Sequence, residues 1–133
     1  MIVVDTNIVA YALIDGPRTR LAREAFRRDS EWRLPHLWRH EFLNILATYA
    51  RSGGANPDQM LSVWRQAEAA LARFEHPVDM PLALELAVAH AISAYDAQFI
   101  ALAQSLEVRC LTDDRELVRK FPRTAISLEL FCR

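Results

Sequence analysis

Apolar residues follow two patterns along the chain. Short continuous apolar runs alternate with longer stretches in which apolar residues recur every three to four positions, the period of one helix face. The runs predict strands, and the periodic stretches predict helices. Strands are expected at residues 1–5, 32–35, 108–111 and 124–127, with a further short one at 76–78. Helices are expected at residues 7–14, 18–28, 36–51, 57–74, 81–92, 96–106 and 114–121, before a terminal turn at 128–131.

Glycine and proline mark the ends of several of these elements. An Asp-Gly-Pro sequence at 15–17 breaks the first helix, and Ser-Gly-Gly at 52–54 ends the third. Asn56 precedes Pro57, which suits the first turn of a helix because its missing N–H would have no partner there. Strands and helices that alternate at this spacing are typical of an α/β fold around a mostly parallel sheet.

Length and cysteine usage narrow the class of protein. The chain has 133 residues, enough for one domain with its own core and too few for two ordinary domains, so we expect a single domain over residues 1–133. No stretch approaches the roughly 20 apolar residues of a membrane span, and the N-terminus has no signal-peptide pattern. Cys110 and Cys132 have no CxxC spacing, and Cys110 lies in an apolar run, so a buried free thiol is expected. These features favour a reducing, cytoplasmic location away from membranes.

Charge is nearly balanced along the chain. The formal net charge is −1, so bulk charge predicts no nucleic-acid partner, and any such site must be a local patch. Arginines crowd residues 18–28, where they could contact an RNA backbone, although a solvated face or a protein contact explains them equally well. Trp38, Trp64 and Phe74 could stack on bases. Trp64, however, lies in the apolar stripe of its helix, which favours packing or a protein interface.

Four acidic residues occur where the ends of strands and helices could bring them together. Asp5 closes the first apolar run, and Glu41 lies in the first turns of the helix after the second strand. Asp96 begins a helix, and Asp114 follows the apolar run at residues 108–111. Ligands bind at the carboxyl ends of the strands in open α/β sheets. A buried carboxylate there needs a counter-ion, and a divalent cation is the simplest partner for several converging carboxylates.

Each acid alone has a structural explanation. Asp96 and Asp114 could be helix N-caps, a position that Asp favours. Glu41 could interact with the dipole of its own helix. The combination of these three with Asp5 on one edge of a parallel sheet is what favours a functional site.

Other acid-based sites fit the sequence less well. A zinc-protease HExxH motif beginning at His40 would need a second histidine where Asn44 stands. A phosphoacceptor receiver domain needs an acidic pair after the first strand and a late lysine, but Asp5 has no adjacent acid and Lys120 is near the wrong element. A haloacid-dehalogenase-type phosphatase needs Asp-x-Asp at the first strand, and Asn7 stands at the second of those positions.

Four segments resemble the PIN-domain nucleases, most of all the VapC-type toxins of bacterial toxin–antitoxin pairs. They are residues 3–7 (VVDTN), 37–41 (LWRHE), 93–97 (SAYDA) and 111–117 (LTDDREL), in the family's order and spacing. The DTN opening alone is weak, whereas the full set of four acids is specific. The resemblance extends from the first residues to about Phe121.

The resemblance implies a PIN-like, three-layer α/β/α sandwich around a short, mostly parallel sheet. It also implies endoribonuclease activity with Mg²⁺ or Mn²⁺, whose catalytic and metal-binding residues carry over as Asp5, Glu41, Asp96 and Asp114. The supporting residues are Thr6, Asn7, Thr112 and Asp113, of which Asn7 and Thr112 match groups that orient carboxylates through hydrogen bonds. The family pattern Thr-x-Asp selects Asp114, but the adjacent Asp113 leaves the choice between them open.

Divalent-metal chemistry suits this set of residues. Mg²⁺ keeps several waters and is commonly held by one or two carboxylates plus substrate phosphate. A metal-bound water is more acidic and can attack phosphorus, while the cation neutralises developing charge. Without a cation, four carboxylates would repel RNA. A catalytically inactive PIN-like module that binds RNA or protein is the alternative, and the presence of all four acids argues against it.

Protein partners are expected on two grounds. The resemblance implies a small cognate antitoxin, a segment of which lies in the acidic cleft with a basic side chain against the carboxylates. Independently, helices 36–51 and 57–74 carry more apolar residues than a thin sheet can cover, and exposed apolar patches usually mark partners. We therefore expect a homodimer. The apolar residues behind this expectation include Phe42, Tyr49, Leu61 and Trp64.

Overall fold

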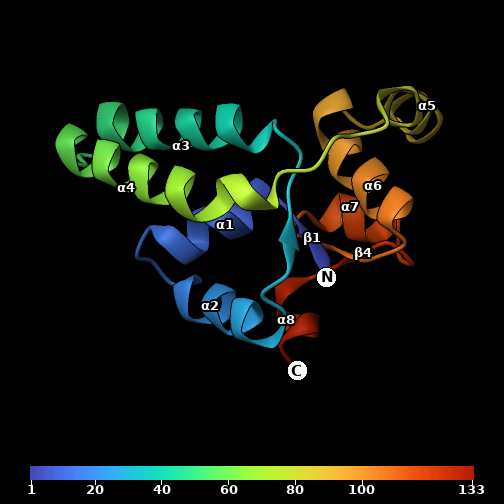
Figure 1. The fold of residues 1–133 in the computed structure, drawn as a ribbon, viewed down its shortest axis with the longest axis horizontal. Coiled ribbons are helices and arrows are strands. Elements are labelled where there is room, and N and C mark those ends of the chain that lie inside the picture. The colour runs from blue at the N-terminus through green and yellow to red at the C-terminus, as the bar shows by residue number, and fades with distance from the viewer.

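A computed structural model describes residues 1–133. Its centre is a sheet of four short parallel strands in the order β2-β1-β3-β4 (Figure 1). The register places Val3 between Arg33 and Cys110. The strands are β1 (Ile2–Val4), β2 (Trp32–Arg33), β3 (Cys110–Leu111) and β4 (Ala125–Ile126). The predicted α/β fold with a parallel sheet is confirmed.

Helices make up most of the rest of the chain. They are α1 (Thr6–Leu13), α2 (Thr19–Arg28), α3 (Trp38–Ser52), α4 (Pro57–Leu71), α5 (Met80–His90), α6 (Ala94–Leu106), α7 (Arg115–Lys120) and α8 (Leu128–Phe131). A 3₁₀ turn, Ala72–Phe74, extends α4 to the predicted end of its helix. The predicted helices therefore all form, with boundaries that shift by a few residues.

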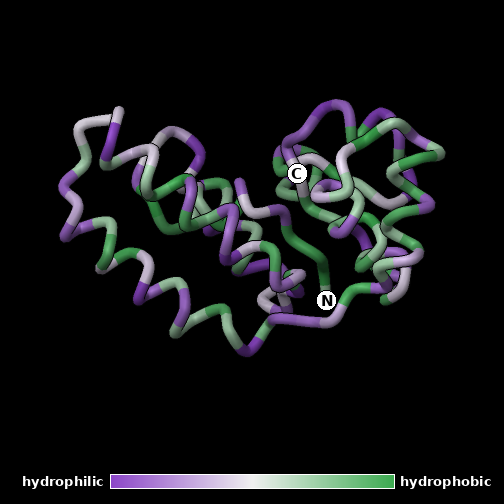
Figure 2. The backbone as a smooth tube through the Cα atoms, turned by 90° about the horizontal axis from the view of Figure 1, so that it is seen from above, coloured by the Kyte–Doolittle hydropathy of each residue, from purple (hydrophilic) through white to green (hydrophobic).

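Alternating side chains of β1 divide the core between the two faces of the sheet. Ile2 and Val4 belong to a core of 17 buried residues shared mainly with α1–α4, and Val3 belongs to a second core of nine with α6 and α7. Successive strand residues point to opposite faces, so helices cover both faces of the sheet. Figure 1 shows the two groups of helices on either side of β1, and Figure 2 shows the hydrophobic N-terminal strand between them. Cys110 lies in the second core as the predicted buried free thiol.

One predicted strand is wrong. Residues 76–78 form no strand, and the only extra pairing there is a single parallel bridge between Leu34 and Glu75. His76 donates its backbone N–H to the Leu34 carbonyl at 2.9 Å. Pro77 then follows, and because it has no N–H it cannot continue the ladder.

Two of the four apolar residues predicted to face a partner, Phe42 and Trp64, pack inside the domain. Phe42 is fully buried, and Trp64 stacks on it and on Trp38 with ring centroids 6.5 and 5.9 Å apart. Tyr49 and Leu61 remain about half exposed. The antiparallel helices α3 and α4 cover each other's aromatic stripes, which the count of apolar residues could not reveal. The preference for packing over base stacking at Trp64 is confirmed.

None of the helices has by itself both the length and the apolar composition that a membrane span requires. Helices α5 and α6 reach the required length and composition only as a pair, with a bend of 118° between them.

Candidate metal centre

Asp5 lies where β1 ends and α1 begins. Its backbone N–H donates to the Leu111 carbonyl of β3 at 3.0 Å, which anchors it to the sheet. Its carboxylate caps α1 by accepting the Asn7 backbone N–H at 3.3 Å, and its other oxygen accepts the Thr112 hydroxyl at 2.7 Å. Both donors are neutral, so they orient the carboxylate without cancelling its charge.

Asp114 lies at the end of the neighbouring strand and caps α7. Its carboxylate accepts the backbone N–H groups of Glu116 and Leu117 at 2.9 and 3.2 Å. Its own N–H donates to the Thr112 hydroxyl at 3.1 Å. Thr112 is fully buried, and its hydroxyl links the two acids through these hydrogen bonds.

Glu41 and Asp96 come from helices rather than from strand ends. Glu41 is in the first turn of α3, where the Thr6 hydroxyl donates to one of its oxygens at 2.8 Å. Asp96 is in the first turn of α6, and Ser93, not Asp96, is the N-cap, because its hydroxyl accepts the Asp96 backbone N–H at 3.0 Å. The expectation that Asp96 begins its helix is therefore corrected by two residues.

All four acids line one cavity of about 240 Å³. No lysine, arginine or histidine lines it, and none of the four carboxylates forms an ion pair within the protein. Its other lining residues are Thr6, Asn7, Asn44 and Ile45.

The cavity disfavours the negative charge that its carboxylates carry. Burial raises the pKa of Asp5, against the hydrogen bonds from Thr112 and Asn7, and the charges of Asp96 and Asp114 raise it further. Burial also raises the pKa of Glu41, as do the charges of Asp5 and Asp96. The pKa of Asp96 is raised by burial and then by Asp114. A bound cation would relieve all of these costs.

The residues present fit a divalent ion that keeps part of its water shell. No three acidic, histidine or cysteine side chains converge closely enough to form a closed metal cage. Mg²⁺ does not need one, because it is usually bound through one or two carboxylates, several waters and substrate phosphate. The predicted quartet thus lines one cavity with carboxylate oxygens, which are suitable ligands for such an ion.

Asp113 does not line this cavity. Its carboxylate pairs with the Arg18 guanidinium and accepts the Leu128 backbone N–H at 3.1 Å. Arg18 also contacts Glu129 at 3.2 Å. Asp113 therefore ties the end of β3 to α2 and α8, whereas its neighbour Asp114 lines the cavity.

Asn7 and Asn44 have positions in the cavity that the sequence did not predict. The backbone N–H of Asn7, not its side chain, orients Asp5, so its side-chain amide lines the cavity without a protein partner. Asn44 lines the cavity and was not predicted as a site residue. Its position three residues after Glu41 places the two on one helix face, which is the signal that could have identified it.

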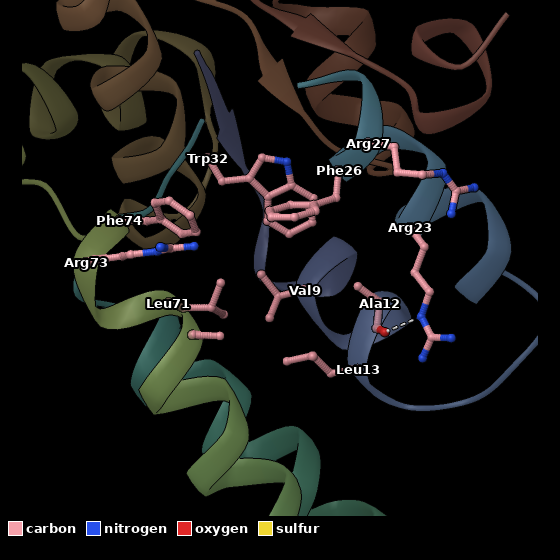
Figure 3. A pocket seen from close by; sticks show the side chains of 11 residues that line it. Val9, Ala12, Leu13, Arg23, Phe26, Arg27, Trp32, Leu71, Arg73 and Phe74 are labelled. Carbon is pink, nitrogen blue, oxygen red and sulfur yellow. Dashed lines mark hydrogen bonds between the residues drawn. The ribbon is translucent and has the colours of Figure 1, made fainter. Parts of the chain in front are cut away.

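A second cavity of about 440 Å³ lies between α1, α2 and the end of α4 (Figure 3). No acid lines it, and it shares no residue with the first. Its apolar lining includes Val9, Phe26 and Trp32. Arg73 extends over the Phe74 ring, with its guanidinium carbon 4.6 Å from the ring centroid. The other two arginines of its lining, Arg23 and Arg27, are held by Asp15 and Glu24.

Comparison with known proteins identifies a family and relatives that the chain resembles. A family model described as PIN domain matches residues 2–123. Ribonuclease VapC3 of Pyrobaculum aerophilum is 31% identical over 91% of this chain and 95% of its own length. Ribonuclease VapC9 of Mycobacterium tuberculosis is 32% identical over 88% of each chain.

A solved structure shares the fold. The crystal structure of PAE2754 from Pyrobaculum aerophilum superposes with a TM-score of 0.77 and 22% identity, covering 98% of this chain and 92% of that one. The family match spans most of the chain, and the curated relatives exceed 30% identity over nearly their whole length. The chain therefore belongs to the PIN domain family, as a member of its VapC type.

Proposed function

We propose that this protein is a Mg²⁺- or Mn²⁺-dependent endoribonuclease and the toxin of a toxin–antitoxin pair. The observation that carries the proposal is the cavity lined by Asp5, Glu41, Asp96 and Asp114 without any basic side chain. Relatives also support the proposal, because proteins similar over nearly the whole chain are named VapC ribonucleases.

The residues of the cavity would have different roles in phosphodiester hydrolysis. Asp5 and Asp114, both oriented through Thr112, would hold the divalent ion from the two strand ends. The bound ion would supply a more acidic water and neutralise charge on the scissile phosphate. Glu41 has one oxygen fixed by Thr6 and the other without a protein partner. Since burial and neighbouring charges raise its pKa, it is suited to accept a proton from the attacking water.

Chelation tests the metal requirement of this proposal. Purified protein should cut a single-stranded RNA in Mg²⁺ or Mn²⁺, stop when EDTA is added, and resume when excess Mn²⁺ is restored. Cleavage that continues in EDTA would rule out the metal-dependent mechanism. Mn²⁺ binding without any cleavage of varied RNA sequences would favour the alternative, a PIN-like module that binds RNA or protein.

The second cavity supports the antitoxin as a partner. An apolar hollow with arginines at its edge suits a partner segment that presents apolar side chains next to acidic ones (Figure 3). Arg73 makes no ion pair within the protein, so its charge is free for such a segment. A basic side chain from another part of the same partner would pair with the acidic quartet and compete with the metal.

Co-expression with the adjacent small reading frame tests the antitoxin. Its product should co-purify with the wild-type chain and relieve growth arrest, and Arg73→Glu should weaken the complex. Arg51→Glu, a charge reversal at the exposed end of α3, serves as the control. Failure to co-purify, with no relief of toxicity, would contradict the toxin–antitoxin assignment and leave the nuclease proposal standing.

A further inference from the structure

Asn44 brings a side-chain amide to the wall of the acidic cavity. It follows Glu41 by three positions on α3, so the two side chains lie on one face of the helix, and both line the cavity. Ile45, the next residue, also lines the cavity and packs against the larger core. This packing fixes the segment of α3 that carries Asn44 beside the cavity.

Very few side chains of the cavity can donate a hydrogen bond to a substrate. Ionised carboxylates only accept hydrogen bonds. The Thr6 hydroxyl already donates to Glu41 at 2.8 Å. The other polar side chains of the lining are the amides of Asn7 and Asn44, and each amide has two N–H donors. Both amides are free of hydrogen bonds to the protein, because the bonds that Asn7 and Asn44 form all use backbone atoms.

A phosphodiester group requires donors of this kind. Its two non-bridging oxygens share a negative charge and accept hydrogen bonds. A divalent ion would offset the charge at the oxygen that it binds, but the other oxygen would face carboxylates that repel it. A lysine or arginine there would pair with the carboxylates themselves, whereas a neutral amide donates to the phosphate and leaves the carboxylates free for the ion. The free amides are therefore suited to the second oxygen.

We propose that Asn44 binds the scissile phosphate, with its side-chain amide donating to the non-bridging oxygen that the divalent ion does not hold. The inference rests on the proposed nuclease function and adds a substrate-binding residue to it. Asn7 is the less suitable donor, because it follows Asp5 by two positions and comes from the strand-end side of the cavity. Asn44 comes from α3 together with Glu41, the group suited to accept the proton of the attacking water. An amide there would hold the phosphate next to that carboxylate.

Substitution of Asn44 separates the effect of its donors from that of its shape. Asn44→Ala removes the donors at an exposed helix position that favours Ala, so the fold should persist and RNA cleavage should fall by about 10–100-fold. Asn44→Asp keeps the shape but replaces the donors with a charge that repels phosphate, so its loss should be at least as large. Asn44→Gln keeps the amide and should recover part of the rate.

The matched control is Gln66→Glu, which also changes an amide to a carboxylate. Gln66 is exposed on α4 and lines neither cavity, so this variant should cut RNA at the wild-type rate. If wild type cuts RNA and Asn44→Ala cuts it equally fast, the inference is overturned and the nuclease function stands. A wild type that cuts no RNA in Mn²⁺ would overturn both.

Calorimetric titration with Mn²⁺ in the absence of RNA distinguishes a phosphate contact from a metal ligand. Asn44→Ala should bind Mn²⁺ as wild type does, whereas Asp5→Asn should lose most of its affinity. RNA binding is then measured by fluorescence anisotropy in Mn²⁺ in a Glu41→Gln background, which slows cleavage because the proton acceptor is lost. Asn44→Ala should weaken this binding about 10-fold or more. Equal losses of Mn²⁺ affinity in Asn44→Ala and Asp5→Asn would make Asn44 a metal ligand and overturn the proposal.

Sulfur substitution in the substrate locates the contact. Sulfur is a weaker hydrogen-bond acceptor than oxygen, so wild type should cut more slowly an RNA in which sulfur replaces a non-bridging oxygen at the cut bond. For one of the two isomers, the one whose sulfur replaces the oxygen bound by Asn44, this slowing should disappear in Asn44→Ala. Sulfur effects of equal size in wild type and Asn44→Ala, for both isomers, would overturn the proposal.

Discussion

Thr112 sets the orientation of two acids from different strands. Its hydroxyl donates to the Asp5 carboxylate and accepts the backbone N–H of Asp114, and it is fully buried while doing so. Groups that orient metal-binding side chains in this way typically change metal affinity or activity by 10–100-fold when removed.

Removal of this hydroxyl should impair the site without unfolding the protein. Thr112→Val keeps the shape but loses both hydrogen bonds, so Mn²⁺ affinity and RNA cleavage should fall by about 10–100-fold. Thr112→Ser should retain most of both, and Thr48→Val, which loses only a hydroxyl bonded within α3, should match wild type. Calorimetric Mn²⁺ titration and initial cleavage rates provide the comparison. Equal losses in Thr112→Ser and Thr112→Val would show that the hydroxyl is not the cause.

The raised pKa values of the acids make metal-free stability depend on pH. Burial and neighbouring carboxylates raise the pKa of Asp5, so the native state holds its proton at a pH where the unfolded chain has lost it. Ionised Asp5 therefore destabilises the fold above its raised pKa, and this cost disappears below the ordinary value of about 4. Asp5→Asn, which can still cap α1, should be more stable than metal-free wild type by about 1 kcal/mol at pH 7.

Urea unfolding of both proteins at several pH values checks this sign. The advantage of Asp5→Asn should shrink toward zero as the pH falls to about 3, and added Mg²⁺ should stabilise wild type but not the variant. A variant less stable than metal-free wild type at pH 7 would contradict the proposed charge repulsion.

At the scale of elements, ion pairs of Arg18 join three segments that are distant in the sequence. Arg18 precedes α2, Asp113 follows β3, and Glu129 belongs to α8. Part of the positive charge of residues 18–28 is thus paired within the fold, because Arg27 and Arg28 also form ion pairs with Glu24. Arg18, Arg27 and Arg28 thus have ion-pair partners within the fold, and the expected role of residues 18–28 as an RNA contact, a solvated face or a protein contact stays a prediction.

Loss of Arg18 should loosen the loop that carries Asp114. Arg18→Ala should reduce the free energy of unfolding by about 1 kcal/mol, a modest value because both partners are partly exposed to screening solvent. Arg20→Ala, an exposed neighbour without an ion pair, should change stability by less than about 0.5 kcal/mol. Equal effects of the two substitutions in urea unfolding would remove the structural role assigned to Arg18.

The strands, helix starts and site positions that the sequence predicted correctly depend on residues close together in the chain. Strand-sized apolar runs and capping residues specify β1, the start of α4 and the positions of Asp5 and Asp114, because each depends only on nearby residues. Tertiary contacts decide the rest. The approach of Asp96 depends on how α6 packs beside β1, and only the packing of α3 on α4 shows that Trp64 is covered while Leu84 on α5 is not.

At the scale of the whole molecule, an acidic cavity has to admit a polyanion. The formal net charge is only −1, yet four carboxylates without an ion-pair partner surround one cavity. RNA would be repelled there unless a divalent ion offsets part of the local negative charge and binds the phosphate directly. The central claim is therefore that bound divalent metal both admits the substrate and enables its cleavage.

Single-turnover RNA cleavage during a Mn²⁺ titration tests this claim most directly. Wild type should show a rate that rises from near zero and saturates with Mn²⁺, and Asp5→Asn should lose at least about 100-fold at every concentration. Asp58→Asn, which removes an equal charge from the exposed start of α4, should follow the wild-type curve. Cleavage by Asp5→Asn at the wild-type rate, or a wild-type rate independent of Mn²⁺, would contradict the account.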